Sequence, residues 1–219
     1  MSSPANQPHS PGRSTKRLVL IFGTGVAALA IAALAVLHLR GGFSDSERPN
    51  GTESPSEAAT GVAADFAKTA CDDFDLAGFE ALAASAAELD TATAQADPDT
   101  ETGVLHCVYR SGSGMDLSLT VVSETAADYA ERTTDQSRRT WEGDPDTYTI
   151  EDFDSGGLSG YTNAHLWDSR QVFLLSAGAG RLLMSVGLTA EPGEFETADA
   201  LAVTGTMAAQ AHERFAAYD

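Results

Sequence analysis

The sequence predicts an α+β protein: a single N-terminal transmembrane helix followed by an antiparallel sheet packed with helices. Three observations support this prediction. Residues 18–37 form an uncharged apolar run, short extended segments follow one another across turns, and the helical segments lie outside these runs of strands. Strands joined by turns of a few residues pair antiparallel, and helices segregated from such strands are typical of the α+β class.

The apolar run LVLIFGTGVAALAIAALAVL, residues 18–37, is long enough to cross a hydrocarbon core about 30 Å thick. Three cations precede it and one follows before the first acid, so the positive-inside rule predicts a cytoplasmic N-terminus. The alternative is a cleaved signal peptide, whose apolar core would be shorter and would precede its small-residue cleavage site. We expect an uncleaved anchor that places the protein in the cell membrane, with a disordered cytoplasmic tail at 1–17, a transmembrane helix at 18–39, an acidic linker at 40–60 and an extracytoplasmic domain at 61–219.

Charge is distributed unevenly along the chain, whose formal net charge is −19. Residues 1–40 contain no acid, so all 32 acidic residues lie beyond them, beside nine of the 13 basic ones. Nucleic acids and anionic head groups need Lys and Arg to neutralise phosphate, so we expect no nucleic-acid partner. The expected partners are the membrane, through residues 18–37, and an unidentified envelope protein or small ligand.

The first part of the predicted domain begins with helical segments and continues with a hairpin. Residues 58–68 and 76–87 are predicted as helix, since apolar residues in the second segment recur every three or four positions. A polar loop is expected over 92–103. Strands are expected at 104–110 and 116–122, on either side of an SGSG turn, because apolar and polar residues alternate along the second strand.

The second part is predicted as a helix, four short strands and a closing helix. Gly178-Ala-Gly180 is a tight hairpin signal between the last two strands. Both alternating sets of side chains before this turn are largely apolar, so the hairpin is expected near the centre of the sheet, covered by helix on at least one side. The predicted elements are a helix at 123–141, strands at 148–153, 161–167, 171–177 and 181–189, and a helix at 194–218.

Two cysteines, Cys71 and Cys107, lie beyond the apolar run. Thiols outside the cytoplasm meet oxidising conditions, so we expect these two to form a disulfide. Their bond would close a loop worth about 4 kcal/mol in the chain-entropy account, and would fix the first helical region against the first strand. The alternative is a redox-active pair, for which a C-x-x-C spacing would be expected.

This layout resembles a large group of exported envelope proteins of unknown function from high-GC Gram-positive bacteria. The shared features are a secretory anchor, a polar linker, a cysteine before the first helix, a cysteine on the first strand, two hairpins, a closing helix and the segment Gly157-Leu-Ser-Gly160-Tyr-Thr-Asn-Ala164. Many members of that group are lipoproteins, and some have a PsbP-like α+β fold. This chain differs by its apolar helix in place of a lipidated cysteine, and the resemblance implies no catalytic residues.

The common catalytic and metal-binding patterns are incomplete in this sequence. Ser159, His165 and Asp168 supply the residue types of a triad, but they lie on one predicted strand, where alternate side chains face opposite ways. The acids from Asp97 to Glu101 begin like a calcium loop but lack its glycine and its last carboxylate, so a weak calcium site is only an alternative. The sequence therefore predicts no catalytic residue, no metal ligand and no cofactor.

These observations favour a non-enzymatic, membrane-anchored interaction or ligand-binding module of the cell envelope. A ligand pocket is expected between sheet and helices, at Trp167, Phe173 and Leu175. One alternative is an envelope hydrolase or metal-dependent enzyme, which requires at least two of His106, His165 and Asp168 to converge. Another is a regulator that passes an external signal to the N-terminal tail.

Overall fold

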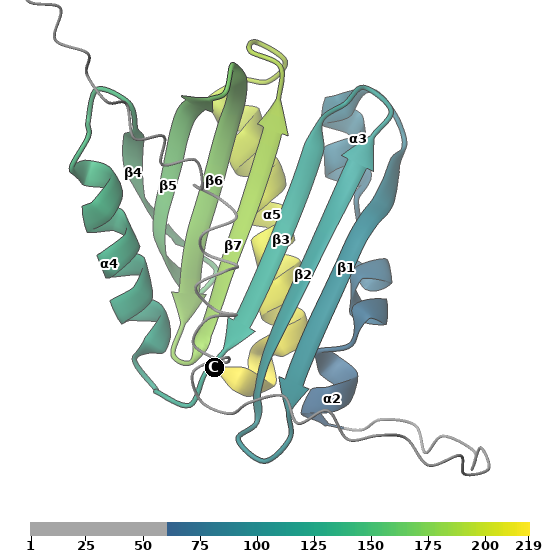
Figure 1. Ribbon diagram of the computed structural model, residues 1–219, viewed down its shortest axis with the longest axis vertical. Helices are drawn as coiled ribbons and strands as arrows, with labels where there is room; N and C mark the ends of the chain where they lie inside the picture. Colours follow the sequence, from purple (N-terminus) through teal and green to yellow (C-terminus); the bar gives the residue numbers. More distant parts are fainter. Residues whose placement is uncertain (1–60) are drawn as a thin grey trace, which may run out of the picture. The chain divides into compact units, whose positions relative to one another are not determined.

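A computed structural model describes residues 61–219, which form a seven-stranded antiparallel sheet with the order β1-β2-β3-β7-β6-β5-β4 (Figure 1). The predicted α+β class with an antiparallel sheet is confirmed. The predicted tail, transmembrane helix and linker lie outside the described residues. Within 61–219, no helix is both long and apolar enough to cross a membrane.

The strands follow the chain as two meanders, and the second joins the first through β7 beside β3. The strands are β1 (Ala87–Asp97), β2 (Thr102–Ser111), β3 (Asp116–Ser123), β4 (Thr149–Ser155), β5 (Leu158–Trp167), β6 (Arg170–Ala179) and β7 (Leu182–Ala190). The helices are α2 (Val62–Asp65), η1 (Lys68–Asp73), α3 (Ala77–Ala83), α4 (Tyr129–Glu142), α5 (Thr197–Phe215) and η2 (Ala216–Tyr218).

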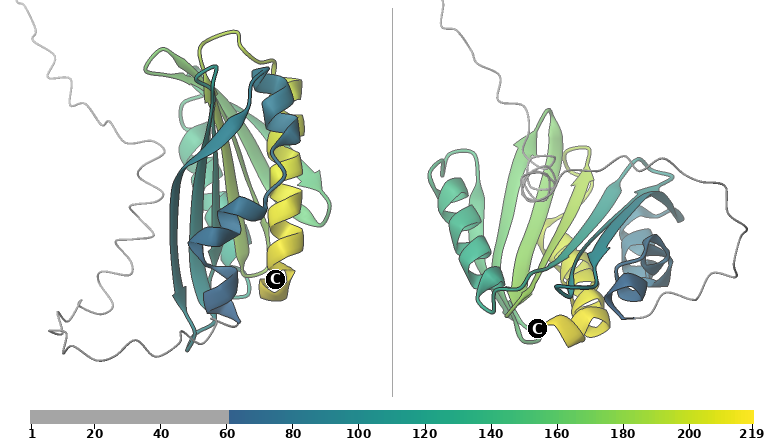
Figure 2. Two further views of the ribbon diagram at one scale, coloured as in Figure 1. Left: turned by 90° about the vertical axis from the view of Figure 1, so that its right-hand side faces the viewer. Right: turned by 60° about the horizontal axis from the view of Figure 1, so that its bottom comes forward.

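Helices lie on both faces of the sheet. The long helix α5 crosses one face, and α2, η1 and α3 lie on the same side near β1 and β2 (Figure 2). Helix α4 packs on the opposite face, against β4 to β7. No described helix covers β1 and β2 on the α4 side, so this part of the sheet presents an open face.

The main core lies between the sheet and α5. Alternate residues of β2, such as Leu105 and Tyr109, are fully buried on the α5 side, whereas His106 between them is half-buried on the open side. Burying such side chains stabilises the fold by about 25 cal/mol per Å² of apolar surface removed from water. Strand β6 is buried on both faces, as expected for a central hairpin covered by α5 on one side and α4 on the other.

The expected disulfide is present. Cys71 of η1 and Cys107 of β2 are bonded across 36 sequence positions, with their Cα atoms 5.7 Å apart. Both residues are buried, and the hydroxyl of Tyr109 donates a 2.6 Å hydrogen bond to the carbonyl oxygen of Cys71. The bond therefore fixes η1 against β2 from inside the core.

Strand β1 corrects the sequence prediction, which expected a helix end and a polar loop over most of its length. Thr91, Thr93 and Gln95 are exposed, and the three alanines at 92, 94 and 96 are half-buried against the core. An edge strand can pack against the core through small alanine side chains, so it does not need large apolar residues. The period-two pattern was therefore present, but in residues of low β-propensity.

The predicted helices at 58–68, 76–87 and 123–141 are shorter in the structure. Helix α3 ends at Ala83 because Ala84 adopts the left-handed conformation, with φ of 50°, and the chain then turns into β1. Helix α4 begins at Tyr129 rather than at 123, because β3 extends to Ser123 and a turn over 124–128 follows it. The first predicted helix is present only as α2 within the described residues, followed by the 3₁₀ segment η1.

Candidate functional site

A groove of about 470 Å³ lies between α3 and α5. Its apolar lining comes from Phe79 and Leu82 of α3, Leu117 of β3, and Val203 and Met207 of α5. This volume falls in the range of small-molecule sites, about 300–1,000 Å³. We call this feature the α3–α5 groove.

Small side chains on the two helices account for the gap. Gly78 and Ala81 of α3, together with Ala202 of α5, line the groove, and none of them has atoms beyond Cβ to fill it. Helix α3 is also only 7 residues long, so it covers a short part of α5. Phe79, whose side chain also lines the groove, is buried in the core and holds α3 in place.

Carboxylates lie at both ends of the α3–α5 groove. Asp199 lies in the first turn of α5, and Asp75 precedes α3. The Gln210 side chain fixes the backbone of Asp75: its Oε1 accepts the Asp75 N–H at 2.7 Å, and its Nε2 donates to the Asp75 carbonyl oxygen at 3.1 Å. The Asp75 carboxylate also accepts the Ala77 N–H at 2.9 Å.

Both carboxylates are available to a cation. Among the described residues, neither Asp75 nor Asp199 takes part in an ion pair. No basic residue lines the groove. An apolar surface with an acidic group at each end therefore favours a ligand that combines an apolar body with positive charge.

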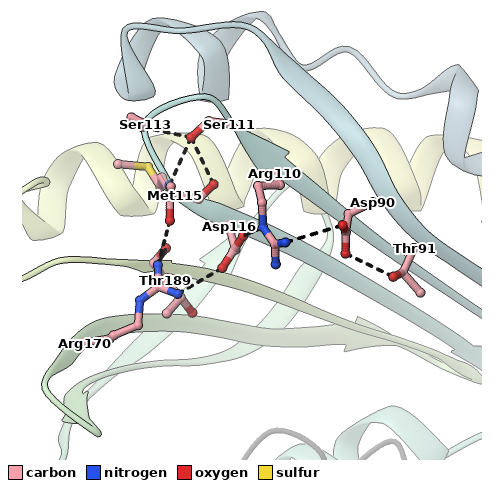
Figure 3. Close-up of polar contacts among 10 residues, drawn as sticks. Asp90, Thr91, Arg110, Ser111, Ser113, Met115, Asp116, Arg170 and Thr189 are labelled. Atoms are coloured by element: carbon pink, nitrogen blue, oxygen red, sulfur yellow. Dashed lines mark hydrogen bonds and ion pairs between the residues drawn. The ribbon is translucent and has the colours of Figure 1, made fainter.

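A second polar feature lies on the α4 side of the sheet, where Arg170 of β6 reaches across β7 to β3 (Figure 3). Its Nη1 donates to Asp116 Oδ2 at 3.1 Å, and its Nη2 donates to the carbonyl oxygens of Gly114 and Thr189 at 2.8 and 3.3 Å. These bonds tie the β2–β3 turn to the start of β6.

The same carboxylate extends this network toward β1. Arg110 Nε donates to Asp116 Oδ1 at 2.9 Å, and Arg110 Nη1 lies 3.5 Å from Asp90 Oδ1 (Figure 3). Each guanidinium thus has a carboxylate partner. This chain of ion pairs links β6, β3, β2 and β1. We interpret it as a structural contact between strands.

The expected ligand pocket at Trp167, Phe173 and Leu175 is not assembled. Phe173 and Leu175 are 1% and 0% exposed in the core beneath α5, with no room for a ligand. Trp167 pairs with Arg170 in the register of β5 and β6, so both side chains lie on the same face of the sheet. This face is opposite to that of Phe173 and Leu175, and Trp167 is 42% exposed there. The apolar groove lies instead between helices, on residues that are far apart in the sequence.

Within residues 61–219, none of the three residues of the enzyme alternative forms a hydrogen bond or an ion pair with another of them. His106 Nδ1 is 2.9 Å from Thr120 Oγ1, while His165 Nδ1 donates to Asn163 Oδ1 at 3.1 Å. Strands β2 and β5 are four strand spacings apart, about 19 Å. Asp168 lies in the turn after β5. Burial lowers the pKa of both His106 and His165.

One carboxylate of the segment that begins like a calcium loop, and one two positions after Cys71, have ordinary structural partners. Asp97 Oδ1 accepts the Asp99 N–H at 3.0 Å in the β1–β2 turn, and Asp73 forms an ion pair with Arg214 at 2.7 Å. Within residues 61–219, no group of three or more His, Cys, Asp or Glu side chains is placed to hold a metal ion.

The fold and this geometry define a disulfide-stabilised α+β domain with an apolar groove that has an acid at each end. No protein-family model matches the sequence, and no curated protein matches it. Among solved structures, the chain is similar to the extracellular domain of PknH from Mycobacterium tuberculosis. The identity is 11% and the TM-score 0.45, over 64% of this chain and 92% of that one.

Proposed function

We propose that this protein is a membrane-anchored, extracytoplasmic binding module without enzymatic activity, and that the α3–α5 groove is its ligand site. The disulfide supports an oxidising compartment, because such bonds are rare in the cytosol. The apolar segment 18–37 and the acidic linker after it supply the anchor and the spacer. The observation that carries the proposal is the groove, with its apolar lining and its two carboxylates.

The proposed ligand is an organic cation with an apolar body. Asp199 and Gln210, which contacts Asp75, are eleven residues apart on α5, or about 16 Å of helix. A linear molecule with an amine at each end and an alkyl chain between them could therefore meet both carboxylates and cover the apolar lining. Apolar burial would supply most of the affinity, and the carboxylates would select the charge.

The test is a calorimetric titration of dodecane-1,12-diamine into the full-length chain in phosphatidylcholine nanodiscs, with empty nanodiscs as the reference. We expect saturable binding of the diamine and none of dodecanedioic acid, which has the same length and the opposite charge. Asp199→Asn should weaken diamine binding about threefold. Glu194→Gln, which removes an exposed carboxylate outside the groove, should leave it unchanged.

A bulky side chain in the groove separates specific binding from attraction to an acidic surface. Ala202→Trp places an indole on the exposed wall of α5 without changing the charge, and should abolish diamine binding. Equal binding of the diacid, or unchanged binding by the Ala202→Trp protein, would contradict the proposal.

A further inference from the structure

The two edges of the sheet differ in how they are protected. Strand β4 is 7 residues long and carries three acids, at 151, 152 and 154. Strand β1 is 11 residues long, about twice the usual strand length, and contains no charged residue from Thr91 to Ala96. Native sheets normally limit edge pairing by short strands, charges or proline, and the middle of β1 has none of these.

The middle of β1 is accessible to another strand. It pairs with β2 along one side, and no described strand pairs with its other side. Figure 2 (left) looks onto this edge, and α2 and η1 lie on the α5 side of β1 rather than along it. The side chains from Thr91 to Ala96 are Thr, Ala and Gln, so they leave room for close backbone approach.

Acidic residues flank this uncharged stretch on both sides. Glu88 and Asp90 precede it, and Asp97 and Asp99 follow it. Of these four acids, only Asp90 forms an ion pair within the described part of the chain, with Arg110 at 3.5 Å. An added strand would therefore meet neutral backbone in the middle and negative charge at each end.

We propose that β1 is a docking edge for an extended segment of a partner protein, uncharged in the middle and carrying Lys or Arg at both ends. The partner would add an eighth strand to the sheet, with main-chain hydrogen bonds giving affinity and the acidic flanks giving selectivity. A second copy of this chain fits less well. Symmetric antiparallel pairing of Thr91–Ala96 places Asp90 opposite Asp97 of the copy, and like charges directly opposite are destabilising. This site is separate from the α3–α5 groove.

The probe is a synthetic peptide with two lysines at each end and alternating Thr and Val between them. Its binding to the full-length chain is measured by fluorescence anisotropy and by amide hydrogen exchange. We expect exchange to slow in β1 and to stay unchanged in β4. A peptide of the same charge with a central proline should not bind, because proline lacks a donor and breaks the strand. A peptide with Glu in place of Lys should not bind either.

Matched variants place the interaction on one edge. Glu88→Gln with Asp97→Asn should weaken peptide binding about threefold or more, whereas Glu151→Gln with Asp154→Asn on the β4 edge should leave it unchanged. Unchanged exchange in β1, equal binding of the proline peptide, or a dimeric chain whose β1 amides are already protected would overturn the proposal. The outcome does not depend on diamine binding, so the two proposals fail separately.

Discussion

Removal of the Cys71–Cys107 disulfide should destabilise the domain by about 4 kcal/mol. The bond spans 36 sequence positions, and the chain-entropy account assigns about this value to a loop of that length. Both cysteines are buried, at 1% and 0% exposure, so Cys71→Ala with Cys107→Ala introduces no polar atom into the core. A domain of this size loses about 2–4 °C in Tm per kcal/mol, which gives a fall of about 8–16 °C.

The assay is thermal unfolding of the full-length chain followed by circular dichroism. Tyr109→Phe is the control, because it removes the hydrogen bond to Cys71 but keeps the covalent link. The control should cost about 1–3 kcal/mol, since the carbonyl oxygen of Cys71 loses its buried donor. If the double alanine variant melts no lower than Tyr109→Phe, the disulfide does not constrain the unfolded chain as argued.

Three further predictions concern packing, ion pairing and pH. Gly160→Ala should lower the free energy of unfolding by about 1–3 kcal/mol or more, because the added Cβ would lie 2.1 Å from a backbone oxygen of β6. Gly205→Ala is the control in α5, and it should raise the Tm slightly because its added Cβ meets nothing within 4 Å. In a double-mutant cycle by urea unfolding, Asp116→Asn and Arg170→Gln should show a coupling of about 1 kcal/mol, and zero coupling would contradict the role of this ion pair. Burial lowers the pKa of His106 below 6.5, so the unfolded chain binds a proton first as the pH falls. Stability should be full above pH 6.5 and decrease below it, and His106→Gln should flatten this part of the profile.

The sheet could be predicted from sequence wherever large apolar residues alternate. Strand β3 alternates Leu117 and Leu119 with polar residues, and it is found where expected. Strand β1 carries the same period, but its inward side chains are alanines, which are common throughout this chain and have low β-propensity. An edge strand needs little apolar volume, so its sequence signal is weak for a physical reason.

The candidate site could not be predicted from sequence because it depends on which side chains are absent between two packed helices. Phe173 and Leu175 have the composition expected of a pocket, yet they fill the core under α5. The groove exists because Gly78 and Ala202 leave space where α3 meets α5, a contact between segments more than 100 residues apart. The disulfide, in contrast, was predictable, since only two cysteines were available to pair.

The most direct test of an anchored, oxidised, extracytoplasmic module is the intact mass of the chain recovered from cell membranes, with and without reductant. We predict an uncleaved chain whose mass rises by about 2 Da on reduction, as one disulfide takes up two hydrogens. A shorter chain that begins within or just after residues 18–37 would contradict the anchor, and a mass unchanged by reductant would contradict the disulfide.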